Sequence, residues 1–542
     1  MSQKSFIKGA MILGIAALVS KLLGGIYRIP YQNIVGNEGL ALYNLVYPMY
    51  TTLLTVSTAG FPIAVSKFVS ERLALNDTYG AQRIFRIAFM VMLVTGLVSF
   101  SGLYFGSDFL AKLVGDPGAS LPIKSVSFAL LIVPIIAVIR GYFQGWQEMM
   151  PTAVSQVFEQ LLRVITILVL SYILIQQSVE LAAAGAVFGA FTGAVLSLMI
   201  LSYYYIRHRR AVTVKQRQSH VRYIPSQGIK QEPSLTLLKR MIFYALPICF
   251  GSLVLPLFNL ADSYTVMNVL QWLGMENLDA RYAFGVYSKG LPLVQLSAIF
   301  ATALSLALVP SISEAKSLRQ HATIQRRTVF ALRLTLIIGL PAAMGLVMLA
   351  EPLNMTLFNE RIGTDIIMVL AVATIFSTME ITTSGILQGV GDAMSPARNL
   401  FIGLLVKITL NIVLILFIGV KGAAVATIFA YMIALALNMR DLQRNIHIRY
   451  EWSKMLIRPL IATLIMAGAV YVTMIGSGAM VANMTHVRLE QAIITMAGVS
   501  VGVIVYGIAL LLTKSLTVDE LDMIPKVGSK IRKFVMRLGI YR

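Results

Sequence analysis

Cysteine is almost absent from this sequence, and its scarcity excludes several kinds of site. The single cysteine, Cys249, lies within an apolar run, so the chain forms no internal disulfide and no thiolate metal cluster. The five histidines lack the spacing of metal ligands, so we assign no metal to them. No G-x-x-x-x-G-K-[ST] run occurs, so the sequence carries no ATP-binding loop of that type.

Charge is scarce as well. Charged residues are 13% of the 542 residues and hydrophobic residues are 57%, and the mean hydropathy is +0.78. This composition excludes a soluble domain and predicts a polytopic membrane protein. The 45 lysines and arginines outnumber the 24 acidic residues and give a net charge of +21. Most of them lie in short loops between apolar runs, which argues against nucleic-acid binding.

The apolar runs predict an all-α fold with about fourteen transmembrane helices. The first run follows Lys4 and Lys8 but is too long for a signal peptide and keeps a lysine in its body, so we expect it to be retained. The predicted spans are 5–27, 41–66, 87–106, 121–139, 152–175, 181–206, 241–268, 282–309, 334–350, 364–388, 399–417, 422–439, 459–476 and 489–513. With these spans most basic residues fall on one side, so both termini are expected in the cytoplasm.

The sequence also repeats itself. Residues 140–170 and 384–416 share a Gln-Gly turn, an acidic residue, a proline and then an apolar helix with a basic residue near its middle. Both copies begin at a cytoplasmic turn, so the repeat is parallel. We predict two six-helix lobes with substrate bound between them near the middle of the membrane, which is a transporter design, and two extra C-terminal helices.

The repeat and the composition predict five segments: an N-lobe at 1–206, a basic cytoplasmic linker at 207–240, a C-lobe at 241–440, the last two spans within 441–513 and a basic tail at 514–542. In the tail, apolar residues follow helical spacing while lysines and arginines occupy the other faces. We expect this tail to lie on anionic membrane lipids as an interfacial helix.

Five basic residues lie within or at the end of apolar runs: Lys21, Arg28, Arg163, Lys289 and Lys407. A charge at the centre of a membrane helix costs about 2.5–3.5 kcal/mol. The set therefore predicts a hydrated cavity that holds an anion. The second span supports a wet interface, because it carries many hydroxyl and amide groups.

Their separate roles leave alternatives open. Lys21 and Arg28 are seven residues apart, so we expect them on one face of a single helix. Arg28 can instead extend to the outer headgroups. Arg163 has Glu159 one turn earlier, which would neutralise it structurally. For Lys289, the intramembrane acid Asp262 is a candidate counter-ion.

Four features together carry a family resemblance: the opening SKLLGGIYR, the PSISEA segment, the two Gln-Gly turns and the duplicated layout. The chain resembles the flippases of the multidrug/oligosaccharidyl-lipid/polysaccharide (MOP) superfamily, in the Gram-positive branch with stage V sporulation protein B and the YtgP-type MurJ proteins. The resemblance implies a multi-pass carrier of the bacterial cytoplasmic membrane, not an enzyme, which we expect to be a monomer. By alternating access it would move lipid II to the outer leaflet. Lipid II is the undecaprenyl-pyrophosphate-linked precursor of peptidoglycan, so this transport would serve cell wall biogenesis and maintain cell shape.

The resemblance also implies roles for individual residues. In the family, cations of the first and eighth spans contact the pyrophosphate. The matching positions in this sequence are Lys21, Arg28 and Lys289, with Arg28 displaced by about one residue. The arginine that the family carries in its second span has no match here. Some members of the family bind sodium, and Asp262, Asn411 and Thr427 resemble three of the sodium ligands. The second acidic ligand expected from the family is replaced here by Ile415. A groove for the lipid tail would lie between 456–475 and 492–512.

Other functions stay open at this point. A flippase for another undecaprenyl-linked glycan, such as a teichoic acid or capsule unit, would bind the same pyrophosphate group. A multidrug or cation antiporter of the superfamily would need an acidic cavity, whereas buried bases outnumber buried acids here. A glycosyltransferase would need an external catalytic domain, and the outer loops are short. Without an ATP site or cofactor, we expect the membrane potential or an ion gradient such as sodium to drive transport.

Overall fold

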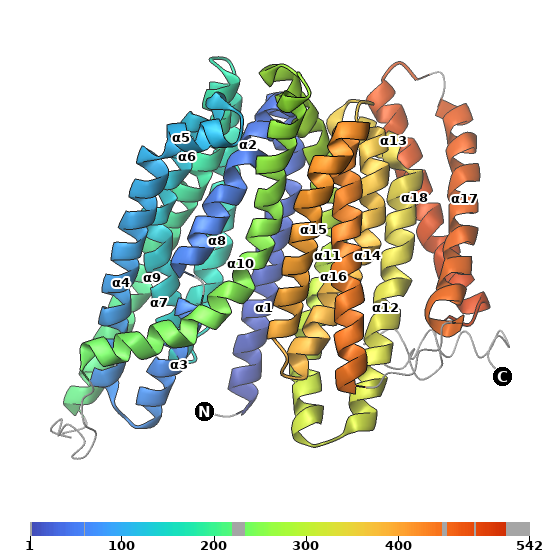
Figure 1. Cartoon of the computed structure of the whole chain (residues 1–542). Helices are drawn as coiled ribbons and strands as arrows, with labels where there is room; N and C mark the ends of the chain where they lie inside the picture. The colour runs from blue at the N-terminus through green and yellow to red at the C-terminus, as the bar shows by residue number, and fades with distance from the viewer. Residues whose placement is uncertain (1–2, 59, 219–232, 447–452, 482–483, 516–542) are drawn as a thin grey trace. The chain divides into compact units, whose positions relative to one another are not determined.

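The computed structural model describes residues 3–58, 60–218, 233–446, 453–481 and 484–515. These residues form helices and short connections without any strand, which confirms the all-α prediction (Figure 1). The longer helices are α1 Gln3–Ile26, α2 Arg28–Thr58, α3 Phe61–Ala74, α4 Thr78–Phe105, α7 Ala129–Gly145, α8 Met150–Leu174, α9 Val179–Gln218, α10 Ser234–Trp272, α11 Asn277–Ser317, α12 His321–Met348, α14 Thr364–Gly389, α15 Met394–Ile418, α16 Lys421–Ile446, α17 Arg458–Val481 and α18 Val487–Leu512. Short helical segments connect them: α5 Ser107–Leu113, the 3₁₀ turn η1 Pro117–Ala119, α6 Ser120–Ser127, α13 Ala350–Phe358 and the π turn η2 Ser453–Ile457.

Within the described residues, 13 segments are long and apolar enough to cross a membrane. The first, Ile12–Ala74, contains 63 residues and includes two of the spans that the sequence predicts. Each of the other segments corresponds to one predicted span. The chain is therefore a multi-pass membrane protein, as its composition indicates.

Contacts divide the chain into two compact units, Met1–Gly285 and Val286–Arg542. The division falls inside α11 and differs from the lobe boundary that the repeat suggests. The reason lies in α10, which the sequence analysis assigns to the C-lobe. In the structure α10 packs against α2, α3 and α4, so the contacts place it in the first unit.

The internal repeat is visible as matching helices in the two units. The helices α8 and α15 both contain 25 residues, and the sequence shift that superimposes their first residues also places Arg163 on Lys407. The preceding helices α7 and α14 end at equivalent glycines, Gly145 and Gly389. A Cβ on Gly145 would lie 2.9 Å from the Ser66 carbonyl oxygen of α3, and one on Gly389 would lie 3.2 Å from the Val309 carbonyl oxygen of α11. In both units the glycine allows two helix backbones to approach closely.

The predicted span 41–66 is wrong in its boundaries. The helix α2 already begins at Arg28, is kinked at Gly36 where φ is 69°, and ends before Gly60, whose φ of 79° is left-handed. Pro62 then occupies the first turn of α3, where a proline needs no hydrogen-bond acceptor. Gly60 also faces the backbone of Ala245, so α10 can pass directly over this break.

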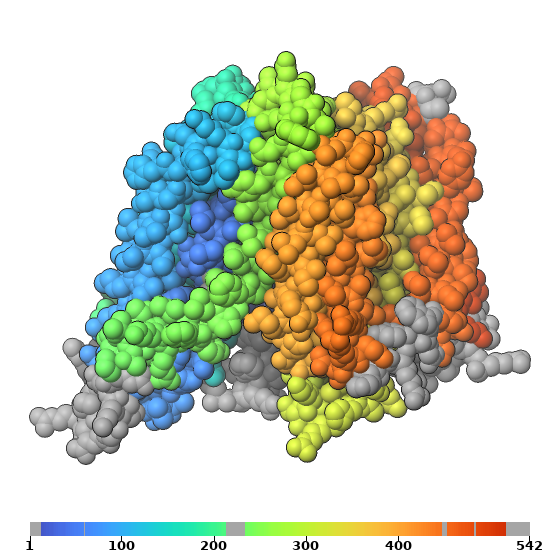
Figure 2. All heavy atoms as spheres, viewed as in Figure 1, coloured from blue at the N-terminus to red at the C-terminus, as the bar shows by residue number. Residues whose placement is uncertain are grey.

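The predicted span 241–268 also differs from the structure. The helix α10 contains 39 residues, or about 58 Å at 1.5 Å per residue, which exceeds the thickness of the hydrocarbon core. Its first half lies across α3, as Figure 1 shows, and covers the lower part of the visible face of the first unit in Figure 2. Pro247 and Pro256 lie inside the helix, where each removes a backbone hydrogen bond and favours a bend.

The predicted basic linker is partly helical. The helix α9 continues to Gln218, and α10 begins at Ser234, so both ends of the segment 207–240 belong to helices. Residues 219–232 and the basic tail 516–542 lie outside the described residues. The membrane-bound linker and the interfacial tail helix therefore stay predictions.

Candidate functional site

Lys21 and Arg28 lie on different helices of the first unit. The helix α1 ends at Ile26 and α2 begins at Arg28, so the prediction of one continuous helix face is wrong. The interruption falls at Tyr27, close to the Gly24-Gly25 pair, where the absence of side chains lowers the cost of a helix end. Lys21 is exposed on α1, and α1 packs against α8, which carries Arg163.

Tyrosine side chains follow one another from the residue before α2 into the second half of that helix. We call them the tyrosine cluster, which comprises Tyr27, Tyr31, Tyr43, Tyr47 and Tyr50. Neighbouring rings have centroid distances between 5.2 Å and 6.2 Å, a spacing at which aromatic pairs attract each other. The hydroxyl oxygens of Tyr27 and Tyr43 are 2.5 Å apart. From the sequence, the second span is predicted only to be rich in hydroxyl and amide groups, without this ring packing.

The tyrosine cluster brings Arg28 and Arg163 to one place. The helix α2, which begins at Arg28, packs against α8, which carries Arg163. The Tyr43 and Tyr47 phenols lie within electrostatic range of both guanidinium groups. Two cations predicted independently from the sequence thus lie near the same part of the tyrosine cluster.

Arg163 is also paired with an acid, as the alternative interpretation predicts. Its Nη2 donates to Glu159 at 2.8 Å, and Arg140 donates to the other carboxylate oxygen of Glu159 at 2.9 Å. Arg140 further donates to Ser155 at 3.1 Å and to Ser197 at 3.0 Å. One buried carboxylate therefore serves two arginines, and this ion cluster keeps an excess of one positive charge.

Three polar atoms of the two arginines and the tyrosine cluster are buried without a hydrogen-bond partner among the described residues. They are Nε of Arg28, Nε of Arg163 and the hydroxyl of Tyr50. Buried donors almost always find an acceptor in the protein, in an ordered water molecule or in a bound ligand. Three such groups beside excess positive charge form a site suited to an anion with several oxygen atoms.

In the second unit Lys289 is fully buried, with an exposed fraction of 0%. Its Nζ donates to Glu360 at 2.6 Å and to the Ile362 carbonyl oxygen at 2.9 Å. The sequence analysis considered Asp262 as the counter-ion, but the structure gives Lys289 a carboxylate from the loop after α13. Sequence spacing could not reveal this pair, because the two residues are far apart along the chain.

The remaining predicted residues are distributed over both units. Lys407 is buried in α15 at the position equivalent to Arg163. Asn411 and Thr427 are buried on the neighbouring helices α15 and α16, and the Thr427 hydroxyl lies 3.3 Å from that of Tyr287. Asp262 is buried in α10, in the first unit. Among the described residues, no three or more His, Cys, Asp or Glu side chains are grouped so that they could hold a metal ion. The sodium site, which includes Asn411 and Thr427, stays a prediction.

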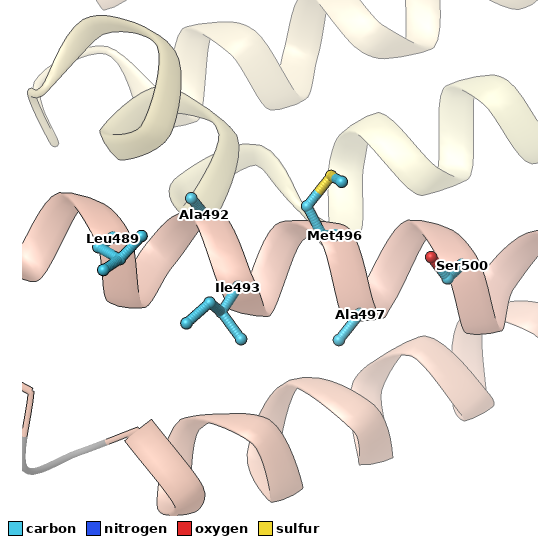
Figure 3. Close-up of a pocket in the computed structure, with 6 residues that line it drawn as sticks. All are labelled: Leu489, Ala492, Ile493, Met496, Ala497 and Ser500. Carbon is cyan, nitrogen blue, oxygen red and sulfur yellow. The ribbon is translucent and has the colours of Figure 1, made fainter.

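A groove of about 430 Å³ lies along α18. Figure 3 shows Ile493 and Ala497 on the side of α17 and Met496 on the opposite side. The groove is apolar except for Ser500, and its remaining lining residues are Leu489 and Ala492. It overlaps the predicted tail groove at 492–512, although its lining comes from α18 rather than from both helices.

Comparison with known proteins decides the family. Residues 6–316 match the polysaccharide biosynthesis protein family, and residues 247–413 match the MatE family. The first match covers more than half of the 542 residues. The chain belongs to the polysaccharide biosynthesis protein family. The predicted resemblance to transporters of the MOP superfamily is thereby confirmed, and the chain is a transporter rather than an enzyme.

Full-length relatives of this family member come from Bacillus subtilis (strain 168). "Uncharacterized membrane protein YabM" is 30% identical, with 98% of this chain and 96% of that protein covered. "Lipid II flippase MurJ" is also 30% identical, with 93% and 95% covered. The solved structure "Lipid II flippase MurJ, inward closed conformation" is 16% identical and covers 92% of this chain and 99% of that chain, with a TM-score of 0.66. At this identity the structural likeness shows the fold.

Proposed function

We propose that the chain is a flippase for lipid-linked oligosaccharides, and that lipid II is its substrate. The observation that carries the proposal is the pair of arginines, Arg28 and Arg163, whose buried Nε groups lack acceptors beside the tyrosine cluster. An oligosaccharide carried on undecaprenyl pyrophosphate presents two or more negative charges and several acceptor oxygens. Guanidinium groups bind such phosphates through paired hydrogen bonds.

The placement of the anion follows from the cost of burying charge. A pyrophosphate cannot enter hydrocarbon without cations and water around it, whereas its prenyl tail has no reason to leave the lipid. Within the first unit we assign phosphate binding to Arg28 and Arg163, and within the second unit, described by itself, to Lys289. Lys21 and Lys407 are further cations of the two units. The groove lined by Ile493 and Met496 is suited to the tail, because it is apolar and open.

The choice of lipid II is supported by the relative "Lipid II flippase MurJ", with which this chain aligns over nearly its whole length. The relative YabM is equally similar at 30% identity, so the glycan has to be tested directly. A flippase for a teichoic acid or capsule unit would use the same cations. A cation antiporter fits less well, because the described ion cluster of the first unit carries excess positive charge.

The proposal includes a location in the bacterial cytoplasmic membrane with both termini in the cytoplasm. It predicts which exposed positions an impermeant thiol reagent reaches in intact cells. In a Cys249→Ala background, cysteines at Glu276 and Arg361 are expected to be labelled, and cysteines at Ser317 and Arg444 are not. All four positions are exposed in the structure, so burial does not prevent labelling. Labelling of Ser317 or Arg444 would refute this orientation.

The test of the function uses purified protein in lipid vesicles. Fluorescent lipid II is incorporated, and its appearance in the opposite leaflet is measured with an impermeant quencher. We expect flipping of lipid II well above that in protein-free vesicles, and slower flipping of an undecaprenyl-pyrophosphate-linked teichoic acid precursor. The reverse preference would assign the chain to the other glycan, and no flipping of either substrate would refute the proposal.

The same vesicles test the driving force. A cation that crosses the whole membrane changes energy by about 2.3 kcal/mol per 100 mV. An inside-negative potential favours return of the empty, cation-lined carrier to its inward-open state and departure of the anionic substrate. Collapsing the potential at constant pH and sodium is therefore expected to slow outward flipping several-fold. If sodium removal alone stops transport, a sodium gradient drives the carrier instead, and Asp262, Asn411 and Thr427 are the residues to replace one by one.

A further inference from the structure

We propose that Glu360 is an internal counter-anion, which occupies the phosphate position at Lys289 in the empty protein and leaves when substrate binds. The inference rests on the proposed function, since it assigns the phosphate to Lys289. Its starting point is the burial of Lys289, whose exposed fraction is 0% while that of the Glu360 side chain is 31%. In this conformation no external anion can reach the ammonium group.

The loop that carries Glu360 is built to hold it there. Asn359 and Gly363 have φ values of 56° and 84°, so left-handed residues lie on both sides of Glu360. The amide of Asn354 donates to the Ile362 carbonyl oxygen at 3.1 Å and to the Thr364 hydroxyl at 3.0 Å. These contacts fix both the loop and the carbonyl group that accepts from Lys289.

The same loop is seated directly on the helix that carries Lys289. Gly363 faces Val286 of α11, one turn before Lys289, and leaves no space for a side chain. The Phe358 ring lies 5.9 Å from the Lys289 Nζ, within the range of a cation–π interaction. Lys289 is thus enclosed by Phe358, Glu360 and Ile362 from one connection.

The chemistry of exchange follows from the contact itself. A carboxylate oxygen at 2.6 Å from Nζ has the same charge-assisted hydrogen bond that a phosphate oxygen would make. The pair avoids the cost of a buried ammonium without a counter-ion while the site is empty. The side chain of Glu360 is partly exposed and can leave toward solvent, whereas Lys289 cannot. A more highly charged anion such as a pyrophosphate is therefore the ligand able to displace it.

A neighbouring ion pair provides a matched control. Arg361 Nε and Glu351 Oε1 lie 3.3 Å apart, and their side chains are 68% and 54% exposed. Glu351→Gln thus removes one carboxylate from the first turn of α13, where it pairs with the residue after Glu360. None of the contacts of Lys289 with Phe358, Glu360 and Ile362 involves Glu351. Exposed pairs of this kind contribute little to stability.

The experiment measures binding of undecaprenyl pyrophosphate to purified full-length protein in detergent. We expect Lys289→Gln to lose binding and Glu360→Gln to bind about tenfold more tightly than the wild type, because the competing anion is gone. Glu351→Gln should bind like the wild type. Glu360→Asp retains the charge but shortens the side chain, so its affinity should fall between the two and provides the test if Glu360→Gln fails to fold.

The outcomes separate this inference from the proposed function. If binding depends on Lys289 but Glu360→Gln binds no more tightly than the wild type, Glu360 has only a structural role and the inference is wrong while the function stands. If Lys289→Gln binds like the wild type, or if no protein binds the lipid, the assignment of phosphate to Lys289 fails and the inference fails with it.

Discussion

Replacing Lys289 by alanine is expected to abolish flipping without loss of protein from the membrane. In vesicles the rate should fall at least about a hundredfold, which corresponds to one charge-assisted hydrogen bond of about 2.7 kcal/mol in the transport cycle. The protein is expected to remain folded because the partner left behind, Glu360, is 31% exposed and can be hydrated. The measurements are the flipping rate and the amount of protein recovered in the membrane.

The control for this variant lies in the same loop. Arg361→Ala removes an equal charge from a side chain that is 68% exposed, and the variant should transport lipid II like the wild type. Wild-type flipping by Lys289→Ala would show that the lysine serves only to hold Glu360. The anion site would then be restricted to the first unit.

Glu159→Gln is expected to have the largest effect on stability. The carboxylate accepts from Arg140 at 2.9 Å and from Arg163 at 2.8 Å, and its side chain is only 8% exposed. Its removal leaves two guanidinium groups close together without a counter-ion. Breaking a buried ion pair from one side typically costs about 3–5 kcal/mol. The measurement is the free energy of unfolding in detergent, from denaturant titration followed by circular dichroism.

An exposed pair in the same unit provides the comparison. Glu71 lies 3.7 Å from Lys67, with side chains that are 50% and 41% exposed, so Glu71→Gln should change the free energy of unfolding by about 1 kcal/mol or less. An added anion such as pyrophosphate should partly restore the stability of Glu159→Gln, because it supplies charge to Arg163. Equal stabilities of the two variants would contradict the buried arrangement around Glu159.

Most of the fold could be predicted from the sequence because long apolar runs have few alternatives in a membrane. The repeat also specified a real equivalence, since the helices carrying Arg163 and Lys407 have the same length in the two units. The helix α10 was less predictable. Its apolar residues fit a membrane span, but Pro247, Pro256 and the close approach at Gly60 let its first half lie across α3.

The candidate site was only partly predictable, for a different reason. Isolated cations in apolar runs can be recognised one by one, and Arg163 and Lys289 are indeed buried. Their partners depend on tertiary contacts. Arg140 lies near a helix end and Glu360 lies in a short loop, so sequence position gave no sign that either joins a buried ion pair. The tyrosine cluster likewise becomes a site only when α8, which carries Arg163, packs against α2.

The central claim is that this chain moves lipid II to the outer leaflet, and cells depleted of it provide the most direct test. The measurement is the amount of each undecaprenyl-linked precursor on either side of the cytoplasmic membrane, determined with an impermeant reagent. The account predicts that lipid II accumulates on the inner leaflet while teichoic acid and capsule precursors still cross. Normal export of lipid II together with inner-leaflet accumulation of another precursor would contradict it.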